Sequence, residues 1–99
     1  MTANEQLARA QGWEQSKGIA AMWHRKGEVF PCRHYPPDYR NDPALTLELM
    51  GKYRIRVAPC YDGTWYAATE DVQCFTNTIK EAVFNCSCAN ENIEVTIDE

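Results

Sequence analysis

The chain has 99 residues, of which 44% are hydrophobic and 11% aromatic, and its formal net charge is −4. This length fits one domain with a modest core, and the hydrophobic content predicts a folded rather than a disordered chain. A chain that is acidic overall lacks the usual electrostatic footprint of a nucleic-acid-binding protein.

The sequence predicts a cytoplasmic protein that makes no use of a membrane. Residues 1–6 lack the basic start and apolar run of a signal peptide, and no apolar run is long enough to cross a bilayer. The five cysteines are therefore expected to be reduced, and their odd number fits poorly with a closed disulfide framework.

The first quarter of the chain predicts a helix followed by a hairpin. Thr2 is a good cap for a helix over residues 2–10, and Gly12 is expected to end it. Residues 13–15 and 21–24 are expected to form two short strands. Trp13 and Trp23 then anchor the hairpin to the core.

A proline-rich loop leads into the second predicted helix. Pro36 and Pro37 favour an extended backbone over residues 35–38. Asp42 is a good N-cap, and Pro43 suits the first helical position because its missing N–H is not needed there. Gly51 is expected to end this helix.

The second half predicts antiparallel strands and a last helix. Residues 53–57 alternate, with Arg54 and Arg56 on the outer side, and residues 65–69 and 72–75 are expected to follow as strands. Thr78 and Glu81 have the spacing of a capping box, and Asn90 is expected to end that helix. Residues 93–97 alternate again and predict an acidic, strand-like tail over residues 90–99.

Together these elements predict an α+β fold with one domain over residues 1–99, in which an antiparallel sheet is layered between helices as an α/β/α sandwich. The expected core is apolar and spread over all the elements: Trp13, Trp23, Leu45, Leu49, Ile55, Val57, Trp65, Val83 and Cys86.

Several motifs occur in the same order as in a known family. They are Gly12-Trp13, Met22-Trp23-His24 with Gly27, the Pro-Pro-x-Tyr loop 35–39, residues 42–44, the aromatic strand 65–67 and the Thr-x-x-Glu-Ala helix start 78–83. Over residues 5–89 the chain resembles the phage ABA sandwich domain family. The resemblance implies a small phage or prophage protein, and it carries over no catalytic residues. The cysteines and the tail 90–99 depart from the family pattern.

The residue types suggest two chemical sites, but the sequence favours neither. His24, Cys32 and His34, with Cys86 and Cys88, have ligand types suited to zinc. However, two cysteines two residues apart on a helix point about 200° apart, so both cannot readily bind one ion. Cys32 with His34 also suggests a nucleophile, but the sequence offers no orienting third group. We therefore expect no metal, no cofactor and no enzyme activity.

The acidic C-terminal third predicts protein binding. Residues 57–99 carry one basic and eight acidic side chains, a net charge of −7. With the resemblance, this favours a stoichiometric inhibitor of a host defence protein, such as an anti-CRISPR or another anti-defence protein. The tail strand could also pair with a second copy of the chain to form a homodimer. The expected binding residues are Tyr35, Tyr39, Asp62, Glu70, Asp71, Glu91, Glu94, Asp98 and Glu99.

The alternative is a nucleic-acid-binding phage accessory protein. Residues 23–56 carry seven basic and four acidic side chains, a net charge of +3. Aromatic side chains such as Tyr35, Tyr39 and Trp23 would then stack on bases. The cations that this alternative uses are Arg25, Lys26, Arg33, Arg40, Arg54 and Arg56.

Overall fold

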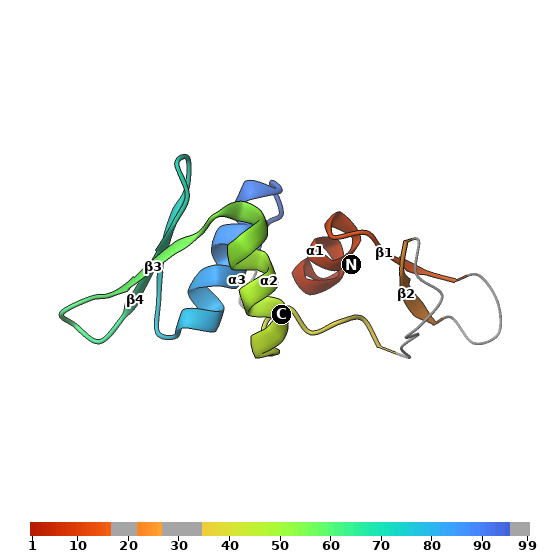
Figure 1. The fold of residues 1–99 in the computed structure, drawn as a ribbon, viewed down its shortest axis with the longest axis horizontal. Helices are drawn as coiled ribbons and strands as arrows, with labels where there is room; N and C mark the ends of the chain where they lie inside the picture. The colour runs from red at the N-terminus through yellow and green to blue at the C-terminus, as the bar shows by residue number, and fades with distance from the viewer. Residues whose placement is uncertain (17–21, 27–34, 96–99) are drawn as a thin grey trace.

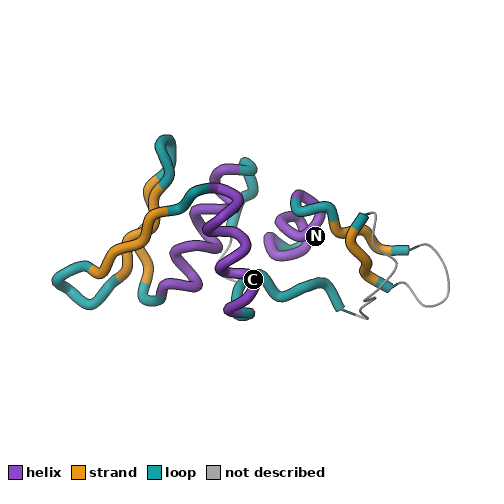
Figure 2. Tube along the Cα trace, viewed as in Figure 1, coloured by secondary structure: helices purple, strands orange, loops and turns teal. Residues whose placement is uncertain are grey.

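Helices occupy the middle of the molecule and strands its two ends. The computed structural model describes residues 1–16, 22–26 and 35–95, and within them three helices lie between a three-stranded antiparallel sheet and a two-stranded antiparallel ribbon (Figures 1 and 2). The expected α+β class is confirmed. The order of the layers differs from the expected sandwich, because α1 packs on β1 and α3 and leaves one face of the three-stranded sheet without a helix among the described residues.

The N-terminal elements follow the predicted capping. Helix α1 (Ala3–Ala10) begins after Thr2, whose Oγ1 accepts the N–H of Glu5 at 3.1 Å. Gly12, with φ of +92°, takes the left-handed conformation that ends the helix. Strands β1 (Trp13–Gln15) and β2 (Trp23–Arg25) then pair antiparallel, as predicted.

Helix α2 (Pro43–Tyr53) begins as predicted and ends two residues later than predicted. The carboxylate of Asp42 accepts the N–H of Ala44 at 3.0 Å. The expectation that Gly51 ends the helix is wrong, because contacts of Lys52 and Tyr53 with other elements hold one further half-turn in place. The last helical residue is Tyr53, and Arg54 caps the helix with a left-handed φ of 53°.

The three-stranded sheet has the order β3–β4–β5, with β3 at Arg56–Pro59, β4 at Trp65–Ala68 and β5 at Gln73–Thr76. The prediction of a strand over residues 53–57 is therefore wrong at its start, since Tyr53 is helical and Arg54 caps the helix. In the register of the sheet, Ala58, Tyr66 and Phe75 form one row across the three strands.

Helix α3 (Ile79–Asn90) lies under the sheet and carries much of the core. Thr78 Oγ1 accepts the N–H of Glu81 at 3.2 Å, which confirms one half of the predicted capping box. The helix packs against β4, β5 and α2, and Val83, Phe84 and Cys86 are fully buried.

The predicted tail strand does not form over residues 93–95, and residues 96–99 lie outside the described part of the chain. Asn92 adopts a left-handed φ of 57°, and the N–H of Ile93 bonds to the carbonyl oxygen of Cys88 at 2.8 Å, so the chain turns back on α3. Ile93 and Val95 pack against the core instead of extending into an exposed edge.

Most of the predicted core is correct. Seven of its nine members are buried, whereas Val57 and Trp65 lie partly exposed at its margin. The largest fully buried side chains lie outside the predicted core: Tyr39, Phe84 and Leu7.

Replacing Arg54 with Val should lower the free energy of unfolding by about 1 to 2 kcal/mol, because a β-branched residue is strained at this left-handed φ. Arg54→Gly should be at least as stable as the wild type. Urea unfolding followed by circular dichroism measures both, with Arg56→Val on the adjoining strand as the control. An unchanged stability of Arg54→Val would contradict this account of how α2 ends.

Candidate functional site

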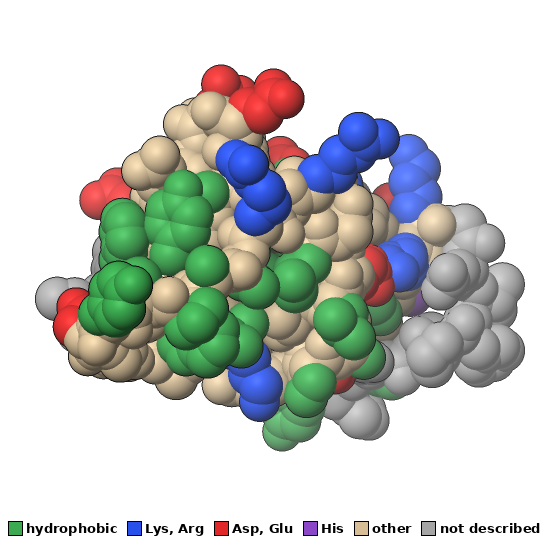
Figure 3. All heavy atoms as spheres, turned by 60° about the vertical axis from the view of Figure 1, so that its left-hand side comes forward, with side chains coloured by type: hydrophobic (Ala, Val, Ile, Leu, Met, Phe, Trp, Pro, Cys, Tyr) green, Lys and Arg blue, Asp and Glu red, His purple; other side chains and the backbone are tan. Residues whose placement is uncertain are grey.

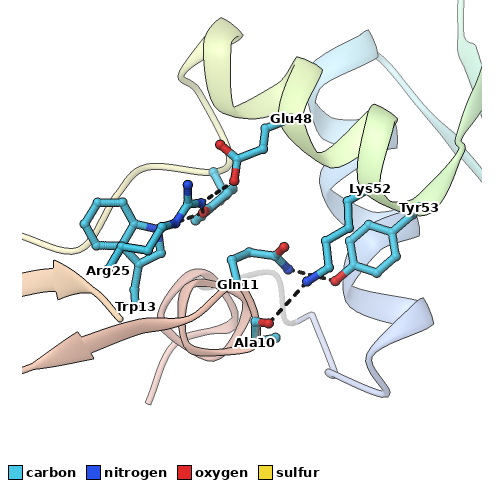
Figure 4. A network of polar contacts seen from close by, with 8 residues as sticks. Ala10, Gln11, Trp13, Arg25, Glu48, Lys52 and Tyr53 are labelled. Atoms are coloured by element: carbon cyan, nitrogen blue, oxygen red, sulfur yellow. Dashed lines mark hydrogen bonds and ion pairs between the residues drawn. The ribbon is translucent and has the colours of Figure 1, made fainter. Parts of the chain in front are cut away.

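The hydroxyl group of Tyr39 joins the N-terminal elements to α2. It accepts hydrogen bonds from Trp13 Nε1 at 2.9 Å and from Arg25 Nη2 at 3.1 Å, and Arg25 also forms an ion pair with Glu48 of α2 (Figure 4). The backbone N–H of Tyr39 donates to Asn4 Oδ1 at 2.9 Å. Tyr39 is fully buried, and burial is the main cause that raises its pKa. The prediction that Tyr39 belongs to an exposed binding surface is therefore wrong.

A second polar link holds the end of α1 against the ends of α2 and α3. Gln11 Nε2 donates to the hydroxyl of Tyr53 at 2.7 Å (Figure 4). That hydroxyl donates in turn to Glu91. Lys52 Nζ donates to the carbonyl oxygen of Ala10 at 3.3 Å. Burial, together with the hydrogen bond to Glu91, raises the pKa of Tyr53. Glu91, which was expected on a binding surface, therefore connects the end of α3 to the end of α2 through Tyr53.

Among the predicted basic residues that the structure describes, some contact other side chains and the others are exposed. Arg25 is taken up by Tyr39 and Glu48, and the guanidinium of Arg40 lies over the ring of Phe84, 4.4 Å from its centroid. Lys26, Arg54 and Arg56 are exposed, whereas Arg33 lies outside the described residues. The five described cations therefore do not form one continuous basic surface.

Arg54 and Arg56 share a pocket with the acidic turn between β4 and β5. The pocket has a volume of about 480 Å³, and Glu70, Asp71 and Asn90 also line it. Residues predicted for two rival functions thus lie together here. The pocket therefore carries both positive and negative side chains. It matches neither the acidic protein-binding site nor the basic nucleic-acid-binding site that the sequence predicts.

The remaining predicted acids and Tyr35 are mostly exposed where they are described. Asp62 lies in the hairpin between β3 and β4, and it accepts hydrogen bonds from Thr64 Oγ1 at 2.6 Å and from Thr64 N at 3.0 Å. These bonds lower the pKa of Asp62. Glu94 is exposed and Tyr35 is 81% exposed, whereas Asp98 and Glu99 lie outside the described residues.

The sheet presents an aromatic surface that the sequence analysis did not identify. Val57, Ala67 and Cys74 point inward to the core, so the alternate residues point outward. We call these outward residues the outer sheet face: Arg56, Ala58, Tyr66, Ala68, Gln73 and Phe75.

The centre of the outer sheet face is a pair of aromatic rings. The Tyr66 and Phe75 ring centroids are 5.1 Å apart, and Phe75 is 62% exposed. Hydrophobic side chains gather on this side of the molecule, with acidic groups near the margins (Figure 3). The period-two pattern of residues 65–68 and 73–76 was the signal that could have located this face.

The cysteines and histidines form no metal cluster in the described residues. Cys86 and Cys88 are both buried, and Cys32 and His34 lie outside the described part. Burial raises the pKa of the Cys86 thiol to about 11, and the neighbouring Cys74 thiol adds to this effect. Cys86 therefore remains a protonated thiol at neutral pH, a state that suits core packing better than metal binding or nucleophilic attack.

Comparison of this chain with known protein families, curated proteins and solved structures finds no match in any of the three. No helix in the described residues is long and apolar enough to span a membrane. The resemblance to the phage ABA sandwich domain family accordingly stays a prediction from the sequence motifs.

Replacing Tyr39 with Phe should lower the free energy of unfolding by about 1 to 3 kcal/mol, because it removes the acceptor shared by Trp13 and Arg25 in a buried site. Tyr61→Phe, at a fully exposed tyrosine, is the matched control and should change stability by less than about 0.5 kcal/mol. Equal stability of the two variants in thermal and urea unfolding would show that the Tyr39 hydroxyl does not join the N-terminal elements to α2.

Proposed function

We propose that this chain is a small protein-binding module that acts by stoichiometric binding, with the outer sheet face as its docking surface. The observation that carries the proposal is the exposed Phe75 ring, 62% accessible, beside Tyr66 on a sheet face that the described helices leave open. Aromatic side chains at the centre of an exposed patch are the usual anchors of protein interfaces.

The charges around the face favour a protein partner that carries cations near an apolar contact. Asp62 lies in the hairpin at one end of the sheet, and Glu70 and Asp71 lie in the turn at the other end. Residues 54–76 contain two arginines and three carboxylates, a net charge of −1. A polyanion would meet this acidic margin unfavourably, whereas lysine or arginine side chains would complement it.

The mode of action that we propose is blocking of a host target. A compact binding domain with one aromatic docking face can act by occupying a partner's surface without changing it chemically. The resemblance to a phage family adds the context of infection, so the proposed target is a host defence protein in the host cytoplasm, as for an anti-CRISPR or another anti-defence protein.

Phe75→Ser should weaken capture of the partner at least about tenfold, because it removes the anchor at the centre of the face. The measurement is affinity capture by tagged protein from nuclease-treated host lysate, followed by titration of the captured protein. Leu47→Ser is the matched control, since Leu47 is 68% exposed on α2 and away from the sheet. Equal binding of Phe75→Ser and wild type would place the docking surface elsewhere.

The second candidate function is binding of single-stranded nucleic acid. Arg56 lies on the outer sheet face one row from Tyr66 and Phe75, so a cation adjoins a pair of rings on which bases could stack. Asp62 at one end of the sheet opposes this candidate, and Glu70 and Asp71 offset Arg54 and Arg56 at the other end, so this candidate stands second.

If the second candidate is correct, Arg56→Gln should weaken binding of a fluorescein-labelled single-stranded oligonucleotide and reduce the salt dependence of that binding. Fluorescence anisotropy at two salt concentrations measures both effects. Arg54→Asn extends the test, because Asn tolerates the left-handed backbone of Arg54. Wild-type protein that binds no oligonucleotide at low salt would eliminate this candidate.

A further inference from the structure

A cavity of about 530 Å³ opens beside the first turn of α3, between the loop that precedes α2 and the start of β4. We call it the α3 cavity. Its volume falls within the range of about 300 to 1,000 Å³ that is usual for small-ligand sites. Its lining combines cationic, amide and aromatic side chains from three parts of the chain: Arg40, Asn41, Trp65, Asn77, Lys80 and Glu81, with Thr78 and Ile79.

Arg40 supplies a fixed cation with an unused donor. Its guanidinium lies 4.4 Å from the centroid of the Phe84 ring, which holds the group against α3. Its Nη2 atom is buried and has no hydrogen-bond partner. The guanidinium carries its positive charge beside the cavity, where it attracts an anionic group.

Lys80 adds a second cation in the first turn of the same helix. The helix has 12 residues, and the N–H groups of its first turn face the end where negative charge is favoured. Glu81 also lines the cavity, so the charged side chains of the lining sum to +1. This balance suits one phosphate group and leaves one carboxylate to accept hydrogen bonds from hydroxyl or amino groups.

Trp65 supplies a flat apolar wall. It lies partly buried at the start of β4, on the inward side of the sheet, and lines the cavity with Ile79. The Asn77 side chain is exposed at the rim and offers both an amide donor and an amide acceptor. An indole ring offers a surface on which a nucleobase can stack, and an amide can hydrogen-bond to the edge of a base.

We propose that the α3 cavity binds a nucleotide, with the phosphate at Arg40 and Lys80 and the base against Trp65. Neither cation group alone nor the aromatic wall alone specifies this ligand. Their placement in one cavity of suitable volume does, because a nucleotide carries an anion and a flat aromatic ring within the same small molecule. The site is separate from the docking surface proposed above, which lies on the opposite side of the sheet.

Tryptophan fluorescence provides the first test. Trp13 and Trp23 are buried near the two-stranded ribbon, so quenching by a ligand in the α3 cavity reports on Trp65. The probes are the monophosphates AMP, GMP, CMP and UMP, the corresponding nucleosides, and inorganic phosphate. The proposal expects saturable quenching by at least one monophosphate, and binding at least about tenfold weaker for its nucleoside and for phosphate.

Charge-removing variants provide the second test, with isothermal titration calorimetry as the readout. Lys80→Gln and Arg40→Gln should each weaken binding of the best monophosphate at least about fivefold. Lys26→Gln removes the same charge at an exposed site on the far side of the molecule and should leave binding unchanged. Lys80 is exposed, so Lys80→Gln keeps the test valid even where Arg40→Gln disturbs the packing on Phe84.

The proposed ligand could be a free nucleotide or the phosphorylated end of a nucleic-acid strand. A 5′-phosphorylated tetranucleotide distinguishes the two. Binding of the free monophosphate at least as tight as that of the tetranucleotide assigns the site to free nucleotides, and tighter binding of the tetranucleotide assigns it to the end of a strand. The proposal is overturned if no monophosphate saturates the quenching, if inorganic phosphate binds equally well, or if Lys80→Gln and Lys26→Gln behave alike.

Discussion

The arrangement of the molecule depends on one buried hydroxyl group. Tyr39 is fully buried, and its hydroxyl accepts from Trp13 on β1 and from Arg25 on β2, while Arg25 also pairs with Glu48 on α2. The ribbon thus reaches α2 through a polar contact that needs exact placement of each donor. A purely apolar contact would tolerate sliding of the ribbon along the helix, because dispersion and burial have little directional preference.

Most of the elements could be predicted from short sequence patterns, because the residues that determine where these elements begin lie within a few positions of that point. Thr2, Asp42 and Thr78 each cap a helix through their own side chains, and the structure shows each of these bonds. The predicted start of the strand 53–57 was wrong, because the contacts that determine the structure there are distant in the sequence. Tyr53 stays helical because its hydroxyl reaches Gln11 and Glu91, which are far away in the sequence. No local pattern encodes those partners.

The candidate site was predicted less well than the fold, because residue type alone does not indicate exposure. Tyr35 and Tyr39 belong to the same short loop, yet one is 81% exposed and the other fully buried. Arg25 pairs with Glu48 and Arg40 packs on Phe84, whereas Arg56 faces outward on the sheet. The aromatic centre of the outer sheet face was missed because Tyr66 and Phe75 are adjacent only through the register of the strands.

Strand β4 connects the two proposed surfaces without mixing them. Trp65 and Tyr66 are consecutive residues of one strand, so their side chains point to opposite faces of the sheet. Trp65 lines the α3 cavity on the helical side, and Tyr66 contacts Phe75 on the open side. A partner on the outer sheet face would therefore leave the cavity accessible, and a ligand in the cavity would leave Phe75 exposed. Coupling between the two would have to pass through the backbone of β4, or along β5 from Phe75 to Asn77 at the cavity, and the ladders between the strands resist displacement of either path. The structure thus favours two independent surfaces, each open to occupation while the other is filled.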